Sequence, residues 1–196
     1  MIDRGSHLGR QRAFHFDQRW CIACRACQIA CKDLHNLPVG VNWRRVVTLE
    51  VGVFPRPLVF HLSLSCNHCA RPACAEACPV GAITKRAEDG VVILDRSLCT
   101  GCRTCEDACP YGALQYDPST RLVSKCDMCV DLLACGEEPA CVAACTMRTV
   151  RVGWLDEMDV GDEPSGVGLP DPSLTRPSLR IHAHRDACPS AADRRG

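Results

Sequence analysis

The spacing of the cysteines constrains this chain more than any other feature of its 196 residues. Of its 18 cysteines, sixteen fall into four compact groups. In order along the sequence these are group one (Cys21, Cys24, Cys27, Cys31), group two (Cys66, Cys69, Cys74, Cys78), group three (Cys99, Cys102, Cys105, Cys109) and group four (Cys126, Cys129, Cys141, Cys145). Aromatic residues make up only 5% of the sequence, so its organic core is thin. Metal sites or disulfides are therefore expected to hold the fold together.

Charge and hydropathy narrow the class of protein. Lys+Arg and Asp+Glu both number 23, which gives no basic footprint for nucleic acid. Residues 1–20 contain no apolar secretory segment, and no run approaches the roughly 18 apolar residues of a membrane helix. We therefore expect no signal or transmembrane segment of its own, and a reducing compartment, where clustered cysteines bind metal more often than they form disulfides.

The spacing within the groups is typical of [4Fe–4S] ligands. Groups one and three read C-x2-C-x2-C-x3-C, in which three cysteines bind one cubane and the fourth binds the other cluster of a pair. Group two widens one spacing to x4, and group four places eleven residues between its two cysteine pairs. Such an insertion is tolerable because the cost of loop closure grows slowly with length.

Groups two and three form a visible repeat. Cys78 lies in A-C-P-V-G-A-I and Cys109 in A-C-P-Y-G-A-L, and the proline closes each loop. Zinc is the main alternative, but it usually takes two C-x2-C pairs around one ion rather than three thiolates within seven residues. Disulfides are the remaining alternative. The pattern favours iron–sulfur clusters over both.

The segments between the groups predict short strands and short helical turns. We expect strands at 58–64 and 91–94, and a hairpin formed by 114–116 and 122–124 around a D-P-S-T turn. Residues 156–180 are rich in Pro, Gly, Asp and Ser, and we expect this tail to need a partner surface to become ordered.

Residues beside the groups also have alternative interpretations. Sixteen thiolates and four oxidised cores together carry a charge of about −8, which nearby cations and backbone N–H groups must offset. The candidate cations are Arg25, Arg71, Arg103 and Lys125, each of which is equally well explained as a surface residue. His68 is interpreted as a neighbour of the ligands or a surface residue, because the cysteine count is already complete. Cys135 and Cys188 fall outside the spacing and are predicted to be free thiols.

The motifs resemble a known family, the four-cluster ferredoxin subunits of complex iron–sulfur molybdoenzymes, and among them those of the anaerobic dimethyl sulfoxide reductase type. The resembling stretches are V-N-W-R-R-V (41–46), L-S-L-S-C-N-H-C (62–69), C-T-G-C-R-T-C-E-D-A-C-P-Y-G-A (99–113), K-C-D-M-C (125–129) and P-A-C-V-A-A-C (139–145). The similarity covers about residues 14–158.

The resemblance implies an α+β fold of two pseudo-symmetric 2[4Fe–4S] ferredoxin-like modules, with short strands, short helices and many loops. Module A comprises residues 14–52 and 117–155, module B comprises 53–116, and 156–196 form an extended C-terminal tail. Thr146 departs from the proline that the family commonly has after the last cysteine, which puts the rigidity of that loop in doubt.

The resemblance also implies how the cysteines divide among four [4Fe–4S] clusters. The quartets are cluster one (Cys21, Cys24, Cys27, Cys145), cluster two (Cys126, Cys129, Cys141, Cys31), cluster three (Cys66, Cys69, Cys74, Cys109) and cluster four (Cys99, Cys102, Cys105, Cys78). Some relatives hold a three-iron cluster at the group-three site because they lack its third cysteine. Cys105 is present here, so a full cubane is expected.

The implied function is electron transfer without catalysis. Electrons would pass from a quinol-oxidising integral membrane anchor subunit to a molybdopterin catalytic subunit that reduces dimethyl sulfoxide or a similar S- or N-oxide. This protein would bind no substrate and no nucleic acid. It would be membrane-associated only through its complex, in the cytoplasm or exported together with its catalytic partner. The same role in a polysulfide, thiosulfate or tetrathionate reductase, a formate dehydrogenase or a nitrite reductase is the alternative; a structural zinc-binding interaction protein is a remote one.

Overall fold

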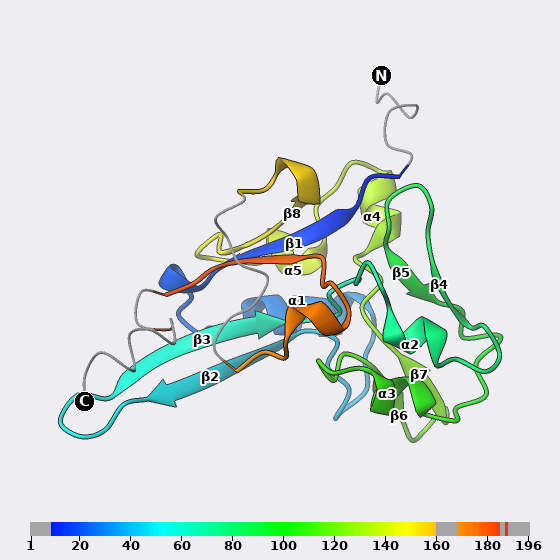
Figure 1. The fold of residues 1–196 in the computed structure, drawn as a ribbon, viewed down its shortest axis with the longest axis horizontal. Helices are drawn as coiled ribbons and strands as arrows, with labels where there is room; N and C mark the ends of the chain where they lie inside the picture. Colours follow the sequence, from blue (N-terminus) through cyan, green and yellow to red (C-terminus); the bar gives the residue numbers. More distant parts are fainter. Residues whose placement is uncertain (1–8, 160–167, 185–186, 188–196) are drawn as a thin grey trace.

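A computed structural model describes residues 9–159, 168–184 and 187 (Figure 1). The strands are β1 Arg12–Asp17, β2 Arg45–Val51, β3 Leu58–Leu64, β4 Ile83–Lys85, β5 Val92–Leu94, β6 Gln115–Asp117, β7 Leu122–Ser124, β8 Val150–Trp154 and β9 Leu179–His182. The α-helices are α1 Ala26–Leu34, α2 Ala73–Glu76, α3 Thr104–Ala108, α4 Val130–Ala134 and α5 Ala140–Ala143, with 3-10 turns η1 Gln18–Trp20, η2 Leu155–Glu157 and η3 Pro172–Leu174. The predicted strands are found within one residue of their expected bounds, and the predicted α+β class is confirmed.

A three-stranded sheet in the order β8-β1-β9 lies along one side of the molecule. The alternation of β1 buries Phe14 and Phe16. β8 pairs with β1 antiparallel, and β9 pairs with it in parallel. β9 therefore gains its order from β1 of the same molecule, so the expectation that the tail needs a partner surface is wrong for this part of it. The pattern concealed this because a four-residue strand is too short for periodicity to distinguish it from a loop.

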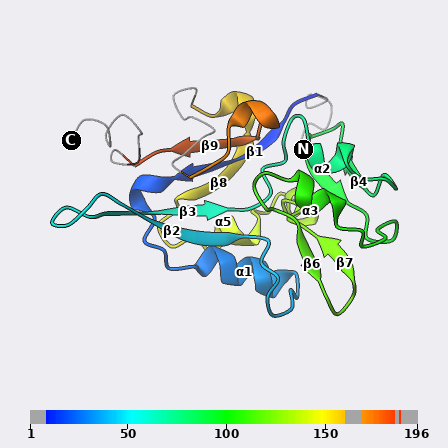
Figure 2. The same ribbon diagram turned by 60° about the horizontal axis from the view of Figure 1, so that its bottom comes forward.

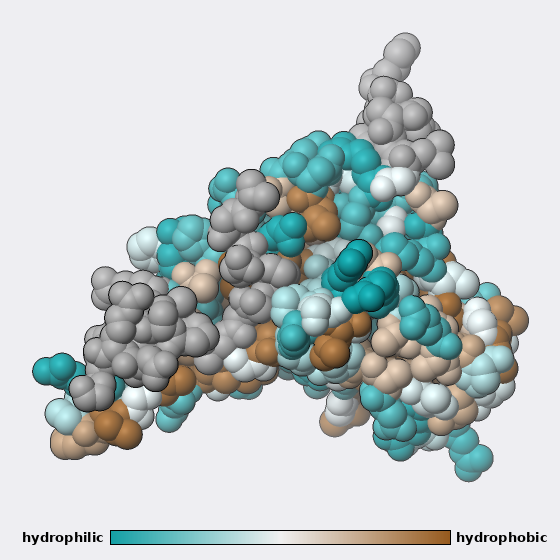
Figure 3. All heavy atoms as spheres, viewed as in Figure 1, coloured by the Kyte–Doolittle hydropathy of each residue, from teal (hydrophilic) through white to brown (hydrophobic). Residues whose placement is uncertain are grey.

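The hairpin β2–β3 is the longest element and projects from the body of the molecule (Figures 1 and 2). Its antiparallel register runs from Arg45 opposite Leu64 to Val51 opposite Leu58. The turn exposes apolar side chains, with Phe54 93% exposed; Figure 3 shows hydrophobic surface at this end.

The other half of the molecule is built from two small hairpins, β4–β5 and β6–β7, with α2 and α3 beside them (Figure 2). α2 packs against α3, while α1 packs against α5. The expected module boundaries at 52/53 and 116/117 fall within the β2–β3 hairpin and within β6. The division into two modules stays a prediction, and these hairpins show that any such modules share backbone hydrogen bonds.

The interior consists of two apolar clusters into which cysteines are built. The first contains Phe16, Val150 and Ile181, and the second contains Ile83 and Leu114. Most of the grouped cysteines are buried or half-buried among these side chains. Sulfur therefore occupies positions that in other small proteins belong to aliphatic core residues.

Candidate metal centres

The four C-x2-C loops share a left-handed residue at the same position. The residue just before the second cysteine of each group has positive φ: Ala23 (55°), His68 (43°), Gly101 (71°) and Met128 (63°). Such left-handed residues are costly away from glycine, and they cluster where a functional site requires them. Successive N–H groups in turns of this kind form concavities that bind anions, iron–sulfur clusters among them.

The quartet assigned to cluster one lies around one small cavity. Its lining includes all four cysteines of that quartet, Cys21, Cys24, Cys27 and Cys145. Cys145 comes from a segment more than a hundred residues away, and the packing of α1 against α5 brings it there.

The quartet assigned to cluster four lies around a second small cavity. Its lining includes Cys78, Cys99, Cys102 and Cys105. Here the fourth cysteine comes from the preceding group, because α2 packs against α3. The two cavities are thus built alike, from three cysteines of one group and one of another.

The remaining two quartets are largely buried and close-set. Burial, together with the nearby thiolates of Cys66 and Cys109, raises the pKa of Cys74 to about 12. Burial also raises the pKa of Cys126 well above its ordinary value, with Cys31 and Cys141 adding to the effect. Cys66 and Cys109 are the predicted partners of Cys74 in cluster three. Cys31 and Cys141 are the predicted partners of Cys126 in cluster two.

The chemistry of this donor set fits an iron–sulfur cluster. Several buried sulfurs in one place favour the neutral thiol, because burial and mutual repulsion both oppose ionisation. A cationic metal core reverses that preference and binds the thiolates. No disulfide joins cysteines within the described ranges, which is consistent with metal binding rather than the disulfide alternative.

Hydrogen bonds reach the sulfur atoms from several sides. The Met128 N–H lies 3.3 Å from Cys126 Sγ, and the Thr149 N–H lies 3.3 Å from Cys145 Sγ. Donors of this kind stabilise negative charge on ligand sulfur. His35 Nε2 lies 3.4 Å from Cys129 Sγ while its ring packs on Trp43, a contact that the local sequence did not indicate.

Two of the predicted ligand cysteines are exposed at the surface. Cys24 and Cys102, the second cysteines of groups one and three, are both exposed. A threonine hydroxyl lies 3.5 Å from each, Thr146 beside Cys24 and Thr104 beside Cys102, and these hydrogen bonds lower the pKa of both thiols. Thr146, which replaces the family's proline, thus contacts a predicted ligand of cluster one.

The four cations predicted to offset the cluster charge differ in how far they are buried. Arg25, Arg71 and Arg103 are wholly or partly exposed, whereas Lys125 is buried. A second buried cation, Arg44, was missed among the candidates. Its only signal was the W-R-R run, in which nothing marks either arginine as buried.

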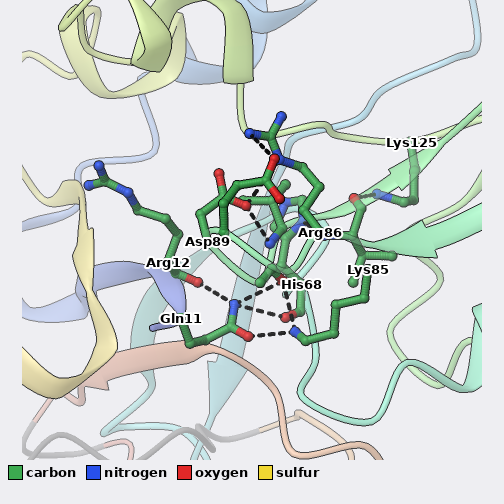
Figure 4. A network of polar contacts seen from close by, with 11 residues as sticks. Gln11, Arg12, His68, Lys85, Arg86, Asp89 and Lys125 are labelled. Carbon is green, nitrogen blue, oxygen red and sulfur yellow. Dashed lines mark hydrogen bonds and ion pairs between the residues drawn. The ribbon is translucent and has the colours of Figure 1, made fainter. Parts of the chain in front are cut away.

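Lys125 connects the two halves of the molecule, because its two acceptors lie in β5 and at the start of group four (Figure 4). Its ammonium donates to the carbonyl oxygen of Val92 and, at 2.8 Å, to that of Cys126. His68 is fully buried nearby and accepts the Val92 N–H at Nδ1, at 3.1 Å. Burial lowers the pKa of His68 well below its usual value, and Lys125 lowers it further, so the imidazole is neutral. His68 therefore supports the backbone at this junction.

A second amine reinforces the same junction (Figure 4). Lys85 donates to the side-chain oxygen of Gln11, to the Cys69 carbonyl at 3.1 Å and to the Gly90 carbonyl at 2.7 Å. The Gln11 amide in turn donates to the Gly90 carbonyl at 3.1 Å. The β1 end of the sheet is thereby joined to the loop that carries group two.

Of the two cysteines outside the four groups, only Cys135 lies among the described residues. Cys135 is exposed, directly follows α4 and lines neither of the two cysteine cavities. Cys188 lies outside the described residues. That neither is a ligand stays a prediction.

Comparison with known proteins identifies the type of site. A 4Fe-4S dicluster domain matches residues 58–155, and a 4Fe-4S binding domain matches residues 19–39. The protein is 38% identical over 188 residues to the B subunit of anaerobic dimethyl sulfoxide reductase from Haemophilus influenzae, a match that covers 90% of this sequence and 91% of that subunit.

Relatives named for other reactions are similar to nearly the same degree. The thiosulfate reductase electron transfer subunit PhsB of Salmonella typhi is 36% identical over 159 residues, covering 79% of this sequence and 82% of that protein. The formate dehydrogenase iron-sulfur subunit of Wolinella succinogenes is 37% identical over 169 residues, covering 75% of this sequence and 83% of that subunit. Among the described residues, no helix has the length and apolar character needed to cross a membrane.

Proposed function

This protein belongs to the family of iron–sulfur subunits that includes the B subunit of anaerobic dimethyl sulfoxide reductase, and we propose that it carries four [4Fe–4S] clusters in the quartets defined above. It is an electron-transfer subunit of an oxidoreductase complex and not the catalytic subunit. The observation that carries the proposal is the left-handed residue before the second cysteine in all four C-x2-C loops, with further cysteines beside these loops.

The clusters would supply one-electron transfer, and the residues of the protein prepare sites for them. The left-handed turns form backbone concavities that suit an anionic cluster, and the burial of most ligand cysteines limits the access of water. Thr104 and Thr146 offer hydroxyl groups to the exposed sulfurs. No nucleophile or proton-transfer group is needed for this function.

We further propose that the protein connects a molybdopterin catalytic subunit to a quinol-oxidising membrane anchor, and that the complex reduces dimethyl sulfoxide or a similar S- or N-oxide. The support is the 38% identity to subunits named for that reductase. A thiosulfate or formate enzyme is the alternative, supported by the 36% and 37% identities.

By family resemblance, cluster one would face the catalytic subunit and cluster four the anchor. The exposure of Cys24 and Cys102 supports this direction, because one exposed ligand belongs to each terminal quartet. Clusters two and three, whose cysteines are largely buried, would lie between them.

Metal analysis of anaerobically purified protein tests the cluster count. Four cubanes require about sixteen irons and sixteen sulfides per molecule, with a brown colour and EPR signals on reduction. A reproducible value near eight irons would contradict four clusters. Stoichiometric zinc in a colourless protein would establish the zinc alternative instead.

A further inference from the structure

Arg44 places a guanidinium in the interior of the molecule. The residue is 2% exposed. Its Nη1 donates to the Ser63 carbonyl at 3.3 Å and to Ser63 Oγ at 3.1 Å, and its Nη2 donates to Ser65 Oγ at 3.0 Å. These partners are all neutral. Across the described ranges, no carboxylate forms an ion pair with Arg44.

A buried cation without a counter-charge is unfavourable. Removing an ion from water costs several kcal/mol unless another charge or strong hydrogen bonds offset it. Arg44 lies over the Phe14 ring, with Cζ 4.5 Å from the centroid, and this contact offsets part of the cost. Its Nε has no hydrogen-bond partner among the described residues. The missing counter-charge must therefore come from something other than a carboxylate.

The groups that supply negative charge are ligand sulfurs. Burial lowers the pKa of Arg44, but the thiolates of Cys141, Cys126, Cys27 and Cys31 outweigh it, and the pKa lies above its ordinary value. Cys27 belongs to the cluster-one quartet and the other three to the cluster-two quartet. Ser63 connects Arg44 to Cys27 directly, because its Oγ accepts from Arg44 and lies 3.4 Å from Cys27 Sγ.

This position gives Arg44 a defined electrostatic effect. Each electron that a cluster accepts makes its site more negative, and a fixed cation nearby stabilises that reduced form more than the oxidised form. This inference rests on the proposed function, in which these quartets hold clusters. We propose that the buried charge of Arg44 raises the reduction potentials of clusters one and two together. Arginine suits this task because it stays charged at any physiological pH.

The sequence offers a matched control. Arg25 lies within group one itself, closer in sequence to the ligands than Arg44, but its side chain is exposed. Water and salt screen an exposed charge, so its effect on the potentials should be small. Burial, and not proximity along the sequence, is what distinguishes the two arginines.

The test uses the full-length protein in its complex, with the variants Arg44→Gln, Arg44→Lys and Arg25→Gln. Iron and sulfide content are measured first. EPR-monitored redox titration then gives the four midpoint potentials, with signals assigned beforehand by single cysteine variants of each quartet. We expect Arg44→Gln to lower the potentials of clusters one and two, leaving three and four nearly unchanged. Arg44→Lys should stay closer to wild type, and Arg25→Gln should shift neither pair appreciably.

The outcomes separate the possibilities. Unchanged potentials in an iron-replete Arg44→Gln protein would overturn the proposal, as would equal lowering by Gln and Lys. Loss of iron in Arg44→Gln but not in Arg44→Lys would support a requirement for the charge. Loss of iron in both Arg44 variants would show that Arg44 acts through the shape of its side chain, and would overturn the proposal. A wild-type protein without sixteen irons would instead contradict the proposed function, before Arg44 is considered.

Discussion

The two halves of the molecule bring cysteines together over very different distances along the sequence. In the half built on α2 and α3, the cysteines come from neighbouring groups within residues 66–109. In the half built on α1, α5 and the sheet β8-β1-β9, cysteines of group one are brought to cysteines of group four that lie 95 to 124 residues further along the sequence. All four C-x2-C loops have a left-handed residue before their second cysteine, so the main difference between the halves lies in the segments that connect these loops.

This difference has consequences for assembly. Loop closure costs only about 0.6 kcal/mol for each doubling of loop length, so pairing groups one and four lowers the stability of the folded protein only slightly. This pairing nevertheless cannot form until the second half of the sequence is present. Because metal binding supplies folding free energy in such sites, each half should depend on its own clusters. The following predictions test this comparison, from the largest expected effect to the smallest.

Truncation after Lys125 should have the largest effect. It removes Cys145 from the cluster-one quartet and three cysteines from the cluster-two quartet, along with β8 and β9. Iron should fall from about sixteen to about eight per molecule, since each cubane holds four. Iron and sulfide analysis with EPR would measure this. A normal cluster-one signal in the truncated protein would contradict the pairing of groups one and four.

Cys102→Ser should impair one end of the electron path. Cys102 is the exposed ligand of the cluster-four quartet. In an assembled complex, quinol-driven oxide reduction should fall strongly, while reduction driven by a dye that feeds the catalytic subunit directly should persist. Cys24→Ser, the matched change at the other end, should also stop quinol-driven turnover. Assembly is checked by co-purification of the partners; full quinol-linked activity of assembled Cys102→Ser would contradict the proposed direction.

Lys125→Met should weaken the junction between the halves. It leaves the carbonyl oxygens of Val92 and Cys126, both on buried residues, without this donor. We expect a loss of about 2–6 kcal/mol in the free energy of unfolding, from about 1–3 kcal/mol for each of the two unsatisfied groups. Urea unfolding followed by the visible absorbance of the clusters measures it. The exposed Arg96→Met is the control, and an equal effect of both changes would show that burial of Lys125 is unimportant.

Gly101→Ala should disturb the group-three turn. Gly101 has φ +71°, and a Cβ there would lie 2.1 Å from the Arg121 carbonyl oxygen. We expect a cost of about 1–3 kcal/mol from backbone strain and steric conflict, with slower cluster incorporation. Ala23 occupies the same place in group one, where an alanine is already accommodated, so Ala23→Gly should have little effect. Comparable losses in both would mean that the steric conflict at Gly101 is not what distinguishes the two turns.

Cys135→Ser should change nothing measurable, and Cys188→Ser is predicted to behave likewise. Cys135 is exposed, and neither cysteine belongs to the repeated spacing. Iron content and the reduced-state EPR spectrum should match those of the wild type. Loss of one cluster in either variant would show that the group-four ligands are assigned wrongly.

The strands and turns near the cysteines were predictable because their signals are local. The D-P-S-T turn and the flanking apolar residues indicated the β6–β7 hairpin, and the run at 58–64 indicated β3. β9 was missed because a four-residue strand in a polar tail carries no usable periodicity, and its pairing with β1 is decided across more than 160 residues. Arg44 was missed for a similar reason, since nothing in W-R-R indicates which arginine is buried.

The sequence by itself determined the cysteine inventory, the repeated loops and the class of metal site. These depend on spacings of a few residues, which backbone geometry converts directly into ligand positions. The tertiary structure decided which distant sulfurs lie together, which cations are buried beside them and how β9 completes the sheet. Those features depend on packing between segments that are remote in sequence, where desolvation and charge are set by all neighbours at once.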